Sequence, residues 1–168
     1  MTRFQLKPLS EKSVDAALSK AEHYRLLNEP RQAESICLDI VEVQPEHQQA
    51  LVVLLLAITD QFGRQMGRTV DEARALLPRL QSDYEREYYA GIICERRAKE
   101  QLAQGTPGSG RIAFHWLEEA MKFYEKAEAM QPAGNDESIL RWNTCARMIN
   151  RHQRLKPATE DPRDTFLE

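Results

Sequence analysis

The sequence predicts an all-α protein, and three observations support this prediction. Glycine (7) and proline (8) are sparse among the 168 residues, whereas alanine, glutamate, leucine and arginine, which favour helices, are common. Apolar side chains recur at helical spacing in seven segments, most of which have a recognisable start or end. No segment has a credible strand pattern. With 42% hydrophobic and 29% charged residues, the chain is expected to fold around a hydrophobic core.

The first three helices are predicted over residues 10–27, 30–43 and 46–62. Asn28 suits the C-terminal cap of the first helix, and Pro30 suits the first turn of the second. The third contains the apolar run "LVVLLLAI", which follows a helix-start signal and continues without a turn. Eight apolar residues are too few to span a bilayer, so this run is expected to be buried among neighbouring helices.

Two capping boxes, in "TVDE" and "SDYE", predict helix starts near residues 70 and 83. Pro78 should end or kink the first of these helices, and Gly105 should end the second. After the flexible link "QGTPGSG", further helices are predicted over residues 111–130 and 135–154. These elements define a helical domain over residues 10–156, between an N-terminal tail (1–9) and an acidic C-terminal tail (157–168).

Two stretches, "AESICLDIVEVQP" from Ala33 and "AMKFYEKAEAMQP" from Ala120, have alanine first and proline twelve residues later. This spacing resembles the tetratricopeptide repeat (TPR), a helix–turn–helix unit of about 34 residues. In the resemblance, the family's first-helix aromatic site falls on Tyr24 in the first copy, and a site where the family often has glycine falls on Gly91 in the other. The resemblance covers roughly residues 14–152, with about three repeats and a degraded middle copy. It implies a TPR-like α-solenoid of antiparallel helix pairs with a C-terminal capping helix.

The final helix is expected to cap this stack with a polar outer surface. Trp142 and Cys145 should point inward, while Arg141, Arg147 and Arg151 should point outward. The basic tract "RMINRHQRLK" at its end could contact an anionic partner, or it could simply complement the helix dipole.

The resemblance further implies a protein–protein interaction module, such as an adaptor, an assembly chaperone or an accessory subunit, rather than an enzyme. In the TPR family the first helix of each pair lines a concave groove, which holds a peptide or a partner helix. Transferred by position, the groove residues are Leu18, Glu22, Arg25, Val52, Leu56, Thr59, Tyr88, Ile92, Glu95, Arg96, Asn143 and Arg147. Leu18 and Glu22 replace the lysine and asparagine with which the family's carboxylate-binding members clamp a peptide terminus. An amphipathic helix or apolar segment therefore suits this groove better. The alternative is that the last helix covers the groove and buries these residues.

The third repeat contains about 17 residues more than a standard unit, which should extend both of its helices. The two helices and their glycine-rich link are expected to form a projecting arm. Its inner faces should consist of Ala98, Leu102, Ile112 and Trp116. Phe114 and His115 would then be candidates for contact with a partner, unless Phe114 packs back onto the arm itself.

Catalytic and metal-binding motifs are lacking, so no cofactor or metal is expected. His115 and Glu119 are one turn apart, but an exposed ion pair explains this spacing better than a metal site. The net charge of −3 does not favour nucleic-acid binding, and no segment predicts membrane insertion. Cys37, Cys94 and Cys145 are predicted to be buried free thiols, which together with the absence of a signal peptide suits the cytoplasm. The predicted partner is another protein. The alternatives are self-assembly into a homo-oligomer through the groove, and a helical-bundle enzyme or metal-binding protein.

Overall fold

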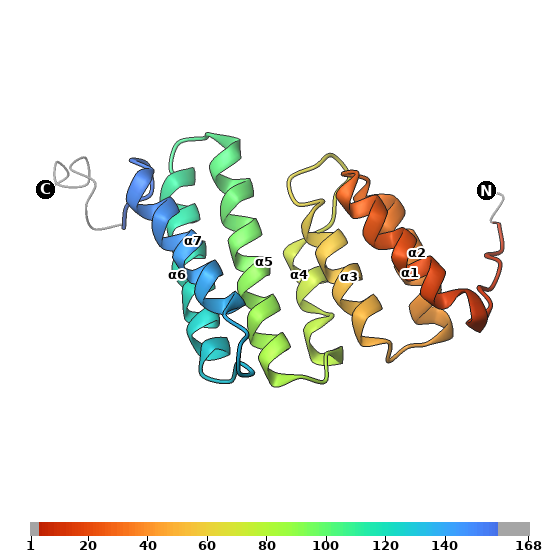
Figure 1. The fold of residues 1–168 in the computed structure, drawn as a ribbon. Coiled ribbons are helices and arrows are strands. Elements are labelled where there is room, and N and C mark those ends of the chain that lie inside the picture. The colour runs from red at the N-terminus through yellow and green to blue at the C-terminus, as the bar shows by residue number, and fades with distance from the viewer. Residues whose placement is uncertain (1–3, 158–168) are drawn as a thin grey trace, which may run out of the picture. The chain divides into compact units, whose positions relative to one another are not determined.

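The computed structural model describes residues 4–157, and every regular element in this range is a helix (Figure 1). The α-helices of this range are α1 (Val14–Leu26), α2 (Pro30–Val43), α3 (Gln48–Thr59), α4 (Val70–Arg74), α5 (Asp83–Gln104), α6 (Ser109–Glu128) and α7 (Glu137–Arg151). Short 3-10 helices precede α1 (η1, Glu11–Ser13) and follow α4 (η2, Leu77–Arg79). The all-α prediction is thereby confirmed for this part of the chain. Between residues 4 and 157, no helix combines the length and apolarity that crossing a membrane requires.

Local capping signals define the helix ends much as the sequence predicted. Asn28 adopts a left-handed conformation (φ 59°) after α1, and Pro30 occupies the first turn of α2. Thr69 and Glu72 form the predicted capping box at the start of α4, with both reciprocal hydrogen bonds present. Gly105 ends α5 at φ 64°, a left-handed conformation that glycine adopts without a Cβ clash.

The described residues divide into two compact units. The N-terminal unit comprises residues 4–61 and 67–80, and the C-terminal unit comprises residues 62–66 and 81–157. Beyond Pro157, the predicted acidic tail lies outside the described residues.

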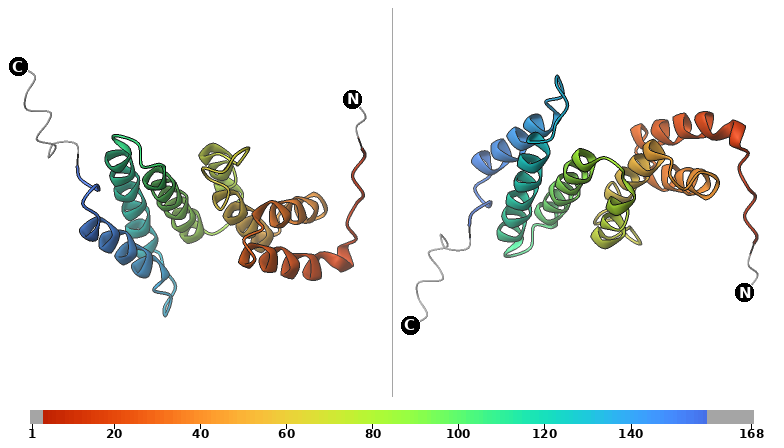
Figure 2. Two further views of the ribbon diagram at one scale, coloured as in Figure 1. Left: turned by 90° about the horizontal axis from the view of Figure 1, so that it is seen from above. Right: turned by 90° about the horizontal axis from the view of Figure 1, so that it is seen from below.

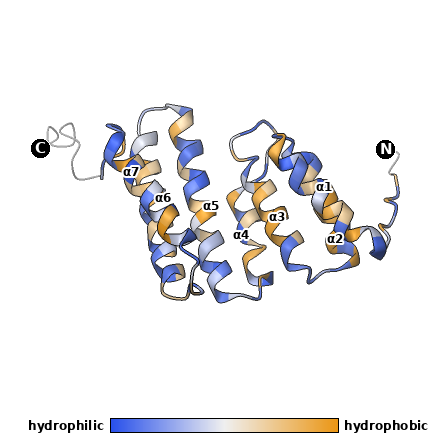
Figure 3. Ribbon diagram, in the orientation of Figure 1, coloured by the Kyte–Doolittle hydropathy of each residue, from blue (hydrophilic) through white to orange (hydrophobic). Residues whose placement is uncertain are grey.

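The core of the N-terminal unit is built around α3. This helix packs against α2 and α4, and α2 packs in turn against α1. Figure 3 shows α3 as largely hydrophobic, and most of the run Leu51–Ile58 is buried. The prediction of a buried helix here is confirmed. Ala33, the alanine of the first repeat-like stretch, is also fully buried, so a larger side chain would have no room.

The C-terminal unit consists of the long antiparallel pair α5 and α6, with α7 packed on α6 (Figure 2). Tyr124 is its largest fully buried side chain, and Ala120 one turn earlier is also fully buried. The Tyr124 ring lies against α5 at Gly91, where a Cβ atom would come within 2.5 Å of a ring carbon. Gly91 is therefore required for the close packing of α5 against α6.

The pairing of α5 and α6 differs from the predicted arm in its register. Ala98 is buried as expected, but Ile112 is 48% exposed, and the next residue, Ala113, is fully buried instead. The prediction for Ile112 was wrong because the small Ala113 side chain allows the two helices to approach more closely than an isoleucine would.

The start of α6 is covered, so the hairpin does not stand free as a projecting arm. The chain after α7 returns to α6, and Leu155 is only 4% exposed. A Cβ atom on Gly110 would lie 2.2 Å from the carbonyl oxygen of Arg154, which shows how closely the two backbones approach. This contact between the start of α6 and the segment after α7 was not predicted from the sequence.

Candidate functional site

Helices α1 and α3 form one face of the N-terminal unit, and most of the groove residues predicted for the first two repeats lie on it. Arg25 Nε donates a hydrogen bond to Asp60 Oδ2 at 2.8 Å, and Gln49 Nε2 donates to Glu22 Oε1 at 2.8 Å. These two bonds therefore join α1 to α3 and to the residue that follows it.

Between these two polar bridges lies a short apolar strip, consisting of Val52 and Leu56. Gln49, Val52, Leu56 and Asp60 recur every three or four residues and so share one side of α3. Val52 and Leu56 are half-buried, which leaves part of each side chain accessible. We refer to Val52 and Leu56 together as the α3 strip.

Two other predicted groove residues of this unit lie deeper. Leu18 is 7% exposed, and Thr59 is 3% exposed, with its hydroxyl donating to the Leu56 carbonyl at 2.8 Å. Leu18 is therefore a core residue and offers no polar group to a ligand.

Three of the four predicted groove residues of α5 are core residues of the C-terminal unit. Tyr88, Ile92 and Glu95 are 7%, 1% and 0% exposed. Among the other predicted residues of this unit, Arg96 and Asn143 are half-buried and Arg147 is exposed. Three of the six predicted groove residues of this unit are therefore buried, and the other three are at least partly accessible.

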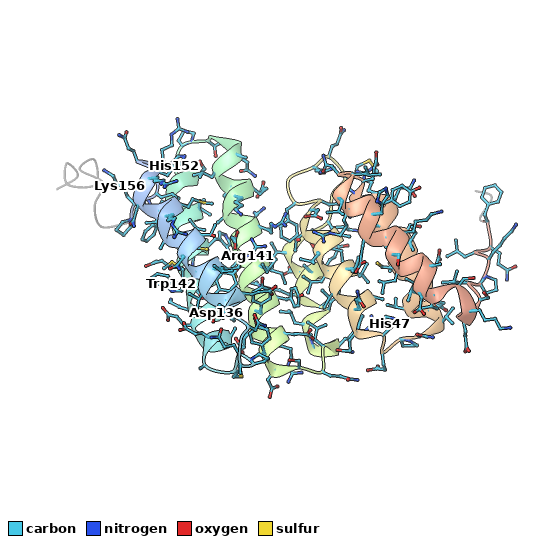
Figure 4. The ribbon with its side chains drawn as sticks, viewed as in Figure 1. His47, Asp136, Arg141, Trp142, His152 and Lys156 are labelled. Carbon is cyan, nitrogen blue, oxygen red and sulfur yellow. The ribbon has the colours of Figure 1, made fainter. Side chains whose placement is uncertain are left out.

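Glu95 is a buried carboxylate with hydrogen-bond donors from three helices. Its Oε1 accepts from Lys99 Nζ at 2.5 Å and from Arg141 Nη1 at 3.3 Å. Its Oε2 accepts from the Tyr124 hydroxyl at 2.7 Å. Figure 4 shows Arg141 directed toward α5, contrary to the prediction that it points outward. The physical reason is that a buried carboxylate requires cationic partners, and Arg141 can reach it from α7.

The electrostatics of this cluster favour the ionised carboxylate. Burial alone would raise the pKa of Glu95, but the hydrogen bond and charge of Lys99, the Tyr124 hydroxyl and the charge of Arg141 lower it overall. Burial and the neighbouring carboxylate raise the pKa of Tyr124, so its hydroxyl remains a donor. Every group in the cluster is partnered, and the arrangement ties α5, α6 and α7 together.

The remaining candidates form no reactive site in the described range. Phe114 is half-buried and His115 is exposed, while Glu119 accepts a hydrogen bond from Lys122 at 2.7 Å. Between residues 4 and 157, no three His, Cys, Asp or Glu side chains converge as metal ligands. The three cysteines are buried thiols, as predicted, and burial raises the pKa values of Cys37 and Cys145 to about 12.

Sequence reasoning missed the polar partners that fix these faces. Asp60 pairs with Arg25 across 35 positions, and no local sequence signal links the two residues. Lys99, Tyr124 and Arg141 were not linked to Glu95, although a glutamate directly after the apolar "GIIC" indicates a buried charge that needs partners.

Comparison with known proteins identifies no relative. No protein-family model matches the chain, and searches of curated proteins and of solved structures found no match either.

Proposed function

We propose that this protein is a TPR-like interaction module, without enzymatic activity, that binds an apolar or amphipathic segment of another protein. The observation that carries this proposal is the α3 strip. Val52 and Leu56 are partly accessible on the side of the unit where the resemblance to the TPR family places a groove, and polar bridges flank them. An apolar centre with a polar rim is the usual composition of a protein-binding surface.

The rim of the strip leaves little net charge to select a partner. Arg25 is paired with Asp60, and Glu22 accepts from the neutral Gln49. Such a rim disfavours highly charged ligands and favours a segment that presents apolar side chains at helical spacing. This is consistent with a partner helix rather than a free peptide terminus.

The size of the strip also constrains the partner. Completing the burial of two half-buried aliphatic side chains contributes about 1 kcal/mol each. Micromolar affinity requires about 8 kcal/mol, so the strip can anchor a partner but cannot bind it alone. The partner must therefore extend over further surface, which suits a helix or a folded protein better than a small molecule.

The proposal can be tested with a matched pair of charged substitutions. Val52→Asp places a carboxylate in the strip, whereas Leu38→Asp places one at a 46% exposed leucine on α2. We expect chemical cross-linking and mass spectrometry in the native cells to identify a protein that the wild-type chain and Leu38→Asp bind and that Val52→Asp loses. Both variants should retain the wild-type circular dichroism spectrum.

Two outcomes would argue against the proposal. Partner binding that is equally sensitive to both substitutions would show that the strip is not the binding surface. A concentration-dependent dimer in light scattering that Val52→Asp abolishes, with no other protein captured, would instead favour the alternative of self-assembly.

A further inference from the structure

One end of the C-terminal unit concentrates positive charge. Arg147, Arg151, Arg154 and Lys156 are all exposed, and we call these four residues the basic surface. No aspartate or glutamate occurs between Ser138 and Pro157, although the whole chain has a net charge of −3. Figure 4 shows Lys156 and His152 at this end of α7, with Asp136 at the opposite end.

The cations of the basic surface lack acidic partners within the described range. Over residues 4–157, none of the four forms an ion pair, whereas Arg25, Lys99 and Lys122 each pair with a carboxylate. Arg151 lies in the last turn of α7, where it complements the negative end of the helix. That effect falls off within one turn, so it does not account for Arg147 one turn earlier.

The backbone that carries these cations has a defined path. Leu155 is buried at 4% exposure, and its N–H donates to the His152 carbonyl at 3.0 Å. The Arg154 backbone lies against Gly110, in the first turn of α6. Arg154 and Lys156 therefore flank an anchored residue, and the positive end of the α6 dipole adds to the potential there.

We infer that the basic surface binds an acidic segment of a partner protein. This inference rests on the proposed interaction function and specifies the chemistry of one partner element. Four cations that form no ion pair within residues 4–157 attract such a segment. A protein segment is favoured over nucleic acid or an anionic membrane because the chain as a whole is negatively charged and would be repelled by an extended polyanion.

A binding assay with a defined probe tests the inference on the full chain. The probe is a fluorescein-labelled peptide that repeats Glu-Leu-Asp, and a Gln-Leu-Asn peptide is the neutral control. We expect salt-sensitive binding of the acidic peptide only. The triple variant Arg147→Gln/Arg151→Gln/Arg154→Gln should weaken it about tenfold, as the loss of several exposed ion pairs implies.

A charge-matched variant controls for long-range electrostatics. Lys7→Gln/Lys12→Gln/Lys20→Gln removes the same charge from exposed positions in the N-terminal part of the chain, and should change the affinity by no more than about twofold. An equal loss in both triple variants would overturn the inference, as would an acidic peptide that does not bind. Tighter binding of oligothymidylate or of phosphatidylserine vesicles through the same three arginines would also overturn it.

The acidic residues of the chain's own terminus are a rival occupant that the assay can exclude. Residues 158–168 include Glu160, Asp161, Asp164 and Glu168. Deleting residues 158–168 should leave peptide affinity within about twofold. Binding that appears only after this deletion would assign the basic surface to the chain's own segment and reject a partner protein as its occupant.

Failure here can be distinguished from failure of the proposed function. Val52→Asp should leave the binding of the acidic peptide unchanged. If the native partner no longer binds Val52→Asp but still binds the arginine triple variant, the proposed function stands and this inference fails. If no partner is captured by any form of the chain, the proposed function itself fails, whatever the peptide assay shows.

Discussion

Each of the two units buries a glutamate, but the units supply its partners differently. Glu34 on α2 is 6% exposed and accepts from Gln61 Nε2 at 2.5 Å and from Arg68. Both of these partners come from the connection between α3 and α4. Glu95 on α5 is 0% exposed, and its partners come from α5, α6 and α7.

The difference lies in what each carboxylate stabilises. Arg68 is 41% exposed on its side chain and is also bonded to Glu72, so the Glu34 pair mainly holds a connection in place. The Tyr124 hydroxyl that binds Glu95 is deeply buried and comes from the C-terminal half of α6. A buried charge with partners on several helices should therefore affect the stability of the whole unit, and one with partners in a connection should affect mainly that connection.

The largest expected effect is that of Glu95→Ala. Removing the Glu95 carboxylate leaves the Tyr124 hydroxyl and two cations without their acceptor, and we expect a loss of about 3 kcal/mol in unfolding free energy. The partial exposure of Lys99 and Arg141 keeps this value at the lower end for buried ion pairs. Glu34→Ala should cost less, about 1–2 kcal/mol. Urea denaturation measures both, and a larger loss for Glu34→Ala would reverse the comparison.

Gly91→Ala should disturb the Glu95 cluster indirectly. The added methyl group would lie 2.5 Å from the Tyr124 ring and force it to move, at a cost of about 1–3 kcal/mol. A double-mutant cycle with Tyr124→Leu provides the control, because the methyl group should cost less once the ring is gone. Additive losses in thermal melts would show that the contact does not limit the packing.

The pH dependence of stability distinguishes Glu95 from an ordinary surface carboxylate. The pKa of Glu95 is lowered in the fold, so its contribution is complete above the pKa of the unfolded chain and is lost as pH falls through the folded value. Glu95→Gln has no such contribution to lose. The difference in unfolding free energy between wild type and Glu95→Gln should therefore shrink on acidification, and a constant difference would contradict the assignment.

Arg68→Ala should have the smallest effect of the series, about 1 kcal/mol or less, because the side chain is 41% exposed. Local hydrogen exchange should increase around residues 67–69 without a matching change in global stability. Lys20→Ala, at an exposed position on α1, is the control and should change neither quantity. A global loss as large as that of Glu95→Ala would show that the connection is part of the core.

The helix ends could be predicted because their determinants are local. Asn28 with Pro30, and Thr69 with Glu72, act within a few residues of each helix end, and the structure places them as the sequence indicated. The burial of the apolar run around Leu55 could be predicted for a similar reason, since a helix that is apolar on all sides must be covered.

The partners of buried charges could not be predicted in the same way. Arg141 lies 46 positions from Glu95, and its helical position alone placed it on the polar side of α7. The register of α5 against α6 also depends on contacts between distant residues, which is why Ile112 and not Ala113 was expected inside. One signal was available, because a glycine such as Gly110 within a helix indicates that another backbone approaches closely.

The buried thiols give each unit its own reporter of local opening. Cys37 belongs to the N-terminal unit, while Cys94 and Cys145 belong to the C-terminal unit, and all three are at most 1% exposed. Because burial raises the pKa values of Cys37 and Cys145 to about 12, a thiolate forms readily only when the surrounding helices separate. The rates at which a disulfide reagent labels Cys37 and Cys145 therefore measure how often the N-terminal unit and the C-terminal unit open locally.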